Sequence, residues 1–402
     1  MSFANIRHTL FTVHMWIGLI LGVLLAALGL SGSLLVYDEQ VANLLDKRPE
    51  ALTAGTPLPL SMIQVIARDA AAEQGAGGGQ MQIILPQERR QPITVRMGGI
   101  SPMGNAAPMR PREGAAQREG RGGREGGARE GGRAQALQLF IDPVSGEVLG
   151  SRKAALPGLL IFAHQLHGNF LMSRDTGRPF VGWLGLAMCL LGVSGLVLWW
   201  PKRGQWQYAF KVRRTATGLR FHRELHAATG LWIFVVFMAV SFSGVVIAWP
   251  QTTGLNPPGA GQRAVPQVEP VEGKHPGATE AVIAATAAIP DLKLRSITIP
   301  AQPDRAISVN YLSHGSINAT ALVDPYRGKV LAIRDNSDRF LAWMRPVHDG
   351  SLGSIWGFLV FLSGLVPTLF VVTGVVMWWK KRQRRVPMTA MTEDVAAEEA
   401  VA

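Results

Sequence analysis

Four histidines stand at the ends of apolar segments, where a titratable ring is costly. His14 opens one segment in "TVHMWIGL" (12–19), and His226 opens another in "ELHAATGL" (224–231). His167 and His348 precede two more, in "HQLHGNF" (164–170) and "RPVHDGS" (345–351). Ionisable residues at membrane depth are functional by default. Because imidazole suits transition metals, a metal or redox role is the first hypothesis for these rings.

The elements that must carry these rings are four segments long enough to cross a bilayer. The chain has 402 residues, of which 48% are hydrophobic and 17% charged. A hydrocarbon core of about 30 Å takes about 20 apolar residues. We place the spans at 13–36, 180–200, 227–249 and 355–379. The first is too long for the apolar region of a signal peptide, so it is expected to remain as a helix.

The positive charge lies at the flanks of these spans. The net charge is +12, with clusters that include Arg7, Lys202, Arg203, Lys380 and Lys381. Short basic flanks stay in the cytoplasm. Both termini and the 201–222 loop are therefore expected inside, and the long connections 40–160 and 250–345 outside. This placement argues against a nucleic-acid partner and makes the lipid bilayer the expected partner. The single cysteine, Cys189, excludes a thiolate metal site and a disulfide framework.

The sequence contains an internal repeat of two similar halves. A shift of 212 positions places His14 on His226, and a shift of 179 positions places "VSGLVLWWPKR" (193–203) on "VTGVVMWWKKR" (372–382). The outer segments repeat too, as "FIDPVSGEVLG" (140–150) and "LVDPYRGKVLA" (322–332). Helices are expected at 60–74 and 277–289. Strands are expected at 80–86, 91–98, 294–300, 305–312 and 317–323, with turns that start at Asp-Pro.

The expected fold class is an α-helical membrane protein with four transmembrane helices in two tandem halves, each half with an extracytoplasmic α+β module. The boundaries are transmembrane helix 1 at 1–39, the first module at 40–155, and an interfacial helix with transmembrane helix 2 at 156–203. A cytoplasmic loop at 204–222, helix 3 at 223–250 and the second module at 251–338 follow, then an interfacial segment with helix 4 at 339–382 and a tail at 383–402. The Gly/Arg/Glu stretch at 99–135 is expected to be a solvated insertion without a core.

Under this symmetry the histidines form two opposed pairs. His14 should face His226 near the inner surface, and His167 should face His348 near the outer surface. Two imidazoles opposed across a helix bundle suit haem iron. Small residues level with each pair would make room for a macrocycle: Gly32 and Gly244 at the outer ends, Gly195 and Gly374 at the inner ends. Ordinary packing of small residues between helices explains the same glycines equally well.

The sequence gives less reason to expect the other histidines to be metal ligands. His164 and His222 share a helix face with His167 and His226. Since they have no counterparts in the repeat, they are expected beside the ligands or as incidental neighbours. His8, His275 and His314 are expected at the surface.

Electron transfer competes with proton relay and metal transport. A transporter normally shows carboxylates or broken helices at mid-depth. The four spans contain no Asp, Glu, Lys or Arg, and Pro367 is the one feature that could break a helix. The pattern therefore favours electron transfer.

These motifs resemble the PepSY-associated transmembrane protein family. The motifs on which the resemblance rests are "VHMWIGL", "LHGNFLM", "GRPFVGWLGL", "LHAATGLW", "VHDGSLG" and the paired "SGLVLWWPKR" and "TGVVMWWKKR". The resemblance implies two PepSY-like modules on the periplasmic side of a bacterial inner membrane. It also implies b-type haem, expected as two groups, held by His14, His226, His167 and His348.

Members of this family include reductases that release iron from ferric siderophores, so the resemblance implies an oxidoreductase with a periplasmic ferric-siderophore substrate. No GxGxxG dinucleotide motif is present, so the electrons must come from a membrane quinol or a cytoplasmic reductant. The alternatives are a non-enzymatic PepSY-type binding or regulatory protein of siderophore uptake or peptidase control, and a metal transporter.

Overall fold

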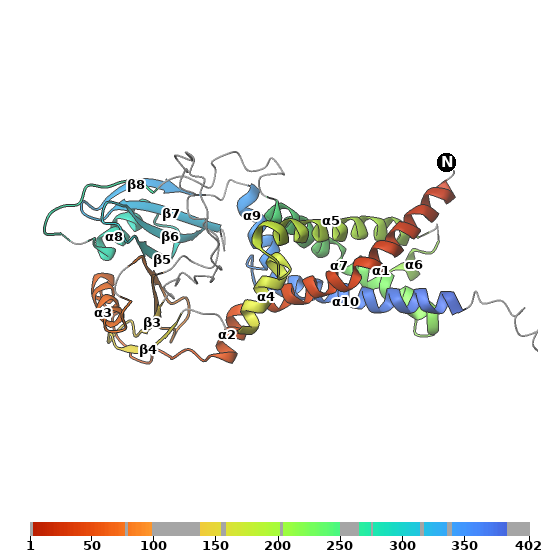
Figure 1. Cartoon of the computed structure of the whole chain (residues 1–402), viewed down its shortest axis with the longest axis horizontal. Coiled ribbons are helices and arrows are strands. Elements are labelled where there is room, and N and C mark those ends of the chain that lie inside the picture. Colours follow the sequence, from red (N-terminus) through yellow and green to blue (C-terminus); the bar gives the residue numbers. More distant parts are fainter. Residues whose placement is uncertain are drawn as a thin grey trace, which may run out of the picture.

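The computed structural model describes residues 3–76, 79–98, 137–153, 158–201, 204–249, 265–274, 276–313, 317–335 and 340–383. The 99–135 insertion, His275, His314 and the tail beyond residue 383 lie outside the described residues. A helical bundle occupies one end of the molecule and a β-sheet with two covering helices occupies the other (Figure 1).

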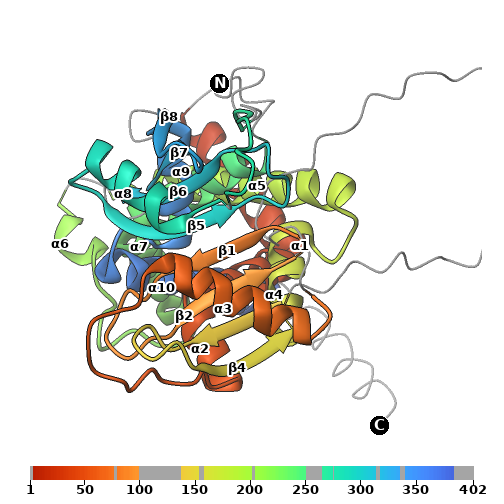
Figure 2. The same ribbon diagram turned by 90° about the vertical axis from the view of Figure 1, so that its left-hand side faces the viewer.

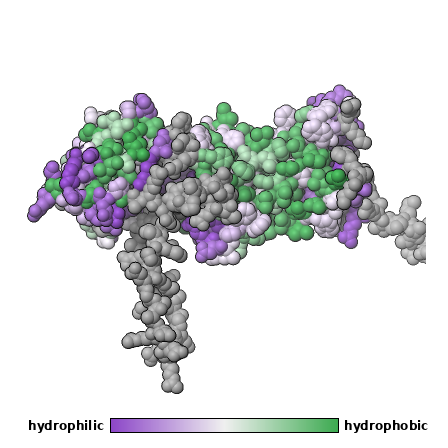
Figure 3. Space-filling model, turned by 90° about the horizontal axis from the view of Figure 1, so that it is seen from above, coloured by the Kyte–Doolittle hydropathy of each residue, from purple (hydrophilic) through white to green (hydrophobic). Residues whose placement is uncertain are grey.

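Each of the four predicted spans coincides with a long apolar helix, to within one residue at its end. These are α1 (Phe3–Val36), α5 (Arg174–Trp199), α7 (Gly218–Ala248) and α10 (Ser354–Gln383). Each has 26 residues or more, or about 39 Å at 1.5 Å per residue, which exceeds the hydrocarbon thickness. Figure 3 shows apolar side chains as a band over this bundle, with polar residues towards both ends of the molecule. The chain is therefore a multi-pass membrane protein.

Helices α1 and α10 pack closely through small residues. A Cβ atom on Gly29 would collide with the carbonyl oxygen of Gly364, and Ser33 Oγ donates to the carbonyl of Phe361 at 2.7 Å. Small residues let helix backbones approach in this way inside a membrane. Pro367 lies in this region, and α10 runs through it as one helix. Pro367 therefore does not break the described part of α10.

Shorter helices connect the bundle to the sheet. Helix α2 (Asp38–Leu45) follows α1, and α4 (Gly158–Asn169) and α9 (Phe340–Asp349) precede α5 and α10. At the far end of the bundle, α6 (Trp206–Ala209) lies in the loop between α5 and α7. Helices α4 and α9 lie where the sheet domain meets the bundle (Figure 1).

The sheet has eight antiparallel strands in the order β4-β3-β2-β1-β5-β6-β7-β8. The strands are β1 (Met81–Ile84), β2 (Ile93–Met97), β3 (Leu137–Ile141), β4 (Val148–Lys153), β5 (Lys293–Ile299), β6 (Ile307–Ser313), β7 (Ile317–Asp324) and β8 (Lys329–Arg334). At the centre β1 pairs with β5, with Met81 opposite Ile299 and Ile84 opposite Ser296. The two predicted modules thus contribute to one continuous sheet.

One hydrophobic core lies between this sheet and the helices α3 (Leu60–Glu73) and α8 (Ala278–Ala288). Ile63, Ile83, Val95, Ile297 and Val309 are all fully buried in it. Figures 1 and 2 show both helices on the side of the sheet away from the bundle.

Hydrogen bonds also join the two segments of chain. Gln64 Nε2 donates to the carbonyl of Pro276 at 3.0 Å, and the Ser61 amide donates to Thr279 Oγ1 at 2.8 Å.

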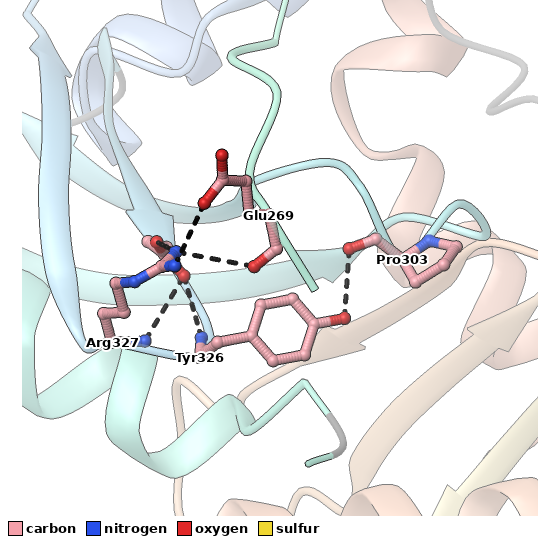
Figure 4. Close-up of polar contacts among 5 residues, drawn as sticks. Glu269, Pro303, Tyr326 and Arg327 are labelled. Carbon is pink, nitrogen blue, oxygen red and sulfur yellow. Dashed lines mark hydrogen bonds and ion pairs between the residues drawn. The ribbon is translucent and has the colours of Figure 1, made fainter. Parts of the chain in front are cut away.

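The Asp-Pro motifs form turns of the same design. Asp142 Oδ1 accepts from the amides of Val144 and Ser145, and Asp324 Oδ1 accepts from those of Tyr326 and Arg327. Burial raises the pKa of each carboxyl, but the hydrogen bonds outweigh it, so the pKa of each lies below its usual value. In the second turn the Tyr326 hydroxyl donates to the Pro303 carbonyl and Arg327 reaches Glu269 (Figure 4).

Candidate functional site

The structure brings the four repeated histidines together as two pairs. His167 and His348 form the sheet-side pair, with ring centroids 5.8 Å apart and Nε2 atoms 3.5 Å apart. His14 and His226 form the distal pair, with ring centroids 6.4 Å apart. Each pair joins a ring from the chain before residue 200 to a ring from the chain after residue 217.

Backbone carbonyls hold the sheet-side rings. His167 Nδ1 donates to the carbonyl of Leu28 on α1, and His348 Nδ1 donates to the carbonyl of Val240 on α7, both at 2.9 Å. A helical side chain covers the turn before its own Cα atom. Gly32 and Gly244, four residues after these carbonyls, leave that turn open.

The glycines therefore make room for imidazole. A Cβ atom on Gly32 would lie 2.7 Å from His167 Cε1, and one on Gly244 would lie 2.9 Å from His348 Cε1. Real Cβ atoms do not approach other atoms so closely. Both positions require glycine as long as the rings stay in place.

Hydroxyl groups hold the distal rings. His14 Nδ1 lies 2.8 Å from Ser194 Oγ on α5, and His226 Nδ1 lies 2.8 Å from Thr373 Oγ1 on α10. Each hydroxyl also donates to a carbonyl of its own helix, Ser194 to Leu191 at 3.2 Å and Thr373 to Leu369 at 2.8 Å. A hydroxyl has one proton to donate. Its oxygen is then free to accept the proton of the histidine Nδ1.

These contacts fix the tautomers. A carbonyl can only accept, so Nδ1 of His167 and of His348 must carry the proton. In neutral imidazole the other nitrogen, Nε2, then has a lone pair. The two Nε2 lone pairs of the sheet-side pair oppose each other at 3.5 Å. Such an arrangement is favourable only when an electrophile, a metal ion or a proton, lies between the rings.

The two pairs lie at different depths. On α1, Leu28 marks the sheet-side level and His14 the distal level, and on α7 Val240 and His226 do the same. Both separations are 14 residues, or about 21 Å along a helix axis at 1.5 Å per residue. The pairs therefore occupy opposite ends of the spanning region.

The donors fit a metal that brings its other ligands with it. Among the described residues no group of three or more His, Cys, Asp or Glu side chains could hold a metal ion. Each pair offers two imidazole nitrogens, and with metal–nitrogen bonds of about 2.0–2.1 Å a metal between two rings would need about 4 Å between those nitrogens. The 3.5 Å of the sheet-side pair is within a small adjustment of this value. Metal-bound histidines usually donate a hydrogen bond from the ring nitrogen that does not bind the metal. The Nδ1 atoms of these rings make such contacts.

Neighbouring histidines do not join either pair. His164 Nδ1 donates to the Leu160 carbonyl of its own helix at 2.9 Å. His222 packs against Phe221, and its Nδ1 is buried without a hydrogen-bond partner in the described structure. The side chain of His8 makes no hydrogen bond with the described residues, and its carbonyl accepts from Thr12 Oγ1.

The predicted small residues differ in what they do. A Cβ atom on Gly195 would make an ordinary contact, 3.4 Å from His14 Cε1, and one on Gly374 would meet nothing within 4 Å. At the distal level the preceding hydroxyl residues, Ser194 and Thr373, contact the rings instead. The sequence analysis did not predict the contacts of the Leu28 and Val240 carbonyls with the rings. The glycine four residues after each carbonyl was a usable signal for these contacts.

Comparisons with known proteins place the chain in a family. A search of curated proteins finds no match. The family model of the PepSY-associated TM region matches residues 11–381, a range that includes the four apolar spans, the sheet and both histidine pairs. The chain belongs to the family defined by the PepSY-associated TM region.

Proposed function

We propose that this protein is a haem-b membrane oxidoreductase that carries electrons across the bacterial inner membrane to ferric iron on the periplasmic side. The observation that supports it most is the sheet-side pair, whose two Nε2 lone pairs oppose each other at 3.5 Å. Both termini lie in the cytoplasm and the sheet lies in the periplasm in this proposal. Two haem groups are expected, one per pair.

The coordination number supports haem over a free metal ion. The two imidazoles of each pair would hold the iron of a haem group, whose porphyrin would supply the remaining nitrogen ligands. When bound, haem supplies one-electron redox chemistry. A lone zinc ion would need two further protein ligands, and the described residues contain no such group.

The chain's own residues hold the iron ligands and tune them. The carbonyls of Leu28 and Val240 and the hydroxyls of Ser194 and Thr373 orient the imidazoles and raise their basicity. The four spans carry no Asp, Glu, Lys or Arg between the two depths, so they offer no charged side chains for an ion pathway.

The overall reaction is balanced in electrons. Each electron from a membrane quinol or a cytoplasmic reductant would convert one Fe(III) in a chelate, expected to be a ferric siderophore, to Fe(II) near the sheet. One quinol would reduce two Fe(III) ions, become the quinone and release two protons. Hard oxygen ligands favour Fe(III), and Fe(II) prefers softer ones, so reduction loosens the chelate. Iron can then leave the chelator without the breaking of any covalent bond within the chelator.

An optical spectrum of the purified full-length protein tests this proposal. We expect two haem groups per chain and the sharp reduced-minus-oxidised bands of low-spin iron with two histidine ligands. His167→Ala and His14→Ala should each remove one haem. The matched control, His164→Ala, should retain both, because His164 bonds only within its own helix.

A folded preparation that stays colourless after incubation with haemin would refute the proposal. The opposed rings would then be explained by a proton shared between them. In that case a non-enzymatic binding or regulatory function of the sheet would be the better account.

A further inference from the structure

The two faces of the sheet differ in chemistry. One face packs its apolar side chains under α3 and α8. The other carries a polar row, one residue per strand, that follows the register from β4 to β6. Its members are Arg152, Gln138, Arg96, Gln82, Thr298 and Ser308. Since α3 and α8 lie away from the bundle, the polar row faces the bundle and the sheet-side pair (Figures 1 and 2).

Arg96 lies within the row. It is half-buried between its cross-strand neighbours Gln82 and Gln138, and no hydrogen bond or ion pair with a described residue engages its guanidinium. Burial lowers its pKa most, the cations Arg48, Arg152 and Arg295 lower it further, and the Glu39 carboxylate raises it, yet arginine remains charged in proteins. Three cations and one carboxylate around a partly desolvated guanidinium favour the binding of a further anion.

The neighbouring cations leave capacity for a ligand. Arg152 pairs with Asp46 and donates from Nε to Gln138 Oε1 at 3.1 Å. Arg48 pairs with Glu39 at 3.0 Å, but its Nε is buried with no hydrogen-bond partner among the described residues. Each guanidinium has five N–H donors. These contacts use only part of them.

A cleft adjoins this end of the row. It has a volume of about 660 Å³, and its charged lining residues are the cations Lys47, Arg48 and Arg152 and the carboxylates Asp46 and Glu50, of which Asp46 already pairs with Arg152. Small-molecule sites typically measure about 300–1,000 Å³. The arginines lie at its walls, and the Phe140 ring lies under the Arg152 guanidinium at 5.2 Å.

We propose that the polar row and this cleft bind a multiply anionic, oxygen-rich iron chelate, one that presents carboxylate or similar oxygens on several sides. This rests on the proposed function and names the charge class of its substrate. The row crosses six strands, about 24 Å at 4.8 Å per strand. A ligand with several anionic oxygens can use cations, amides and hydroxyls along it, whereas one lipid phosphate would reach only one or two strands.

The test uses gallium(III) citrate, because Ga(III) resembles Fe(III) in size and charge but is not reduced. Binding to the full-length protein is measured by calorimetry in nanodiscs of zwitterionic lipid. An uncharged gallium tris-hydroxamate serves as the comparison ligand. The variant is Arg96→Gln, and the control is Arg68→Gln on α3, which lies on the opposite side of the sheet.

We expect saturable binding of gallium citrate, no comparable binding of the uncharged chelate, and Kd raised at least tenfold in Arg96→Gln with little change in Arg68→Gln. Hydrogen bonds to charged groups contribute about 1.5–3 kcal/mol, and about 1.4 kcal/mol is tenfold. Thermal melts should show that both variants are folded. Equal affinity in wild type and Arg96→Gln, no binding of gallium citrate, or its displacement by anionic lipid would overturn the proposal.

The outcomes separate this proposal from the proposed function. Gallium citrate binding needs neither haem nor electrons. A colourless protein that binds it keeps the anion site and loses the reductase. A haem protein that reduces ferric hydroxamate as fast as ferric citrate and binds no gallium citrate keeps the reductase and loses the anion site.

Discussion

Alanine at position 32 is expected to displace the sheet-side ring. The new Cβ atom would lie 2.7 Å from His167 Cε1, whereas comfortable contacts between heavy atoms measure about 3.5–4.0 Å. The ring must therefore retreat by about 0.8 Å. Its bond to the Leu28 carbonyl, now 2.9 Å, would then lengthen beyond the range of a good hydrogen bond.

The cost follows from these two changes. Overpacking typically costs about 1–3 kcal/mol, and a lost hydrogen bond about 0.5–1.5 kcal/mol. A net loss of about 2 kcal/mol in ligand alignment corresponds to about a 30-fold lower affinity for haem at this level. Gly244→Ala should behave similarly, because its Cβ atom would lie 2.9 Å from His348 Cε1.

Two matched variants serve as controls. A Cβ atom on Gly374 meets nothing within 4 Å, and one on Gly195 makes an ordinary contact of 3.4 Å. Glycine in a helix costs about 0.5–1 kcal/mol relative to alanine, so both controls should be as stable as wild type or slightly more stable. Haem per chain and thermal melting of the purified variants are the measurements. If Gly32→Ala matches Gly374→Ala in both, the position assigned to the His167 ring is wrong.

Three further outcomes are expected. Ser194→Ala and Thr373→Val leave a distal Nδ1–H without its acceptor and should weaken haem binding about 10–100-fold in haemin titrations; Thr373→Ser should restore it. Asp324→Asn should lower the melting temperature at pH 7. Because the folded-state pKa of Asp324 is depressed, its stabilisation is present above its unfolded pKa of about 3.9, and the gap between the two proteins should close as the pH falls below about 4. Gln64→Leu removes two hydrogen bonds between the segments that precede β1 and β5, to the Pro276 carbonyl and from the Ala278 amide, and should cost about 1–3 kcal/mol in denaturant unfolding.

Hydropathy and the internal repeat were sufficient to predict the membrane helices. Their apolar runs exceed the length of any soluble core helix, so little competes with the membrane interpretation. The same repeat predicted that His14 would approach His226 and that His167 would approach His348, which the structure shows. Helices α1, α5 and α7 begin at Phe3, Arg174 and Gly218, before the predicted spans at 13, 180 and 227, because their first turns lie outside the apolar windows.

The joined sheet could not be predicted in this way. Met81 and Ile299 pair across more than 200 residues, and the repeat describes each half by itself. Strands β1 and β5 would each be an unprotected edge in a separate module, and exposed edges favour pairing. That argument says that an edge strand needs a partner, but the short sequence "MQII" does not indicate which strand the partner is.

The placement of the hydrogen bonds suggests what a bound group would do to the whole bundle. Each ring is held by its own part of the chain: His14 by α5, His167 by α1, His226 by α10 and His348 by α7. The contact within each pair instead joins the helices before residue 200 to those after residue 217. A group that binds both rings of a pair therefore binds only the assembled bundle and stabilises it by mass action. Direct packing of α1 on α10 and of α5 on α7 already joins the two parts, so the proposed cofactor would strengthen an arrangement that the helices define.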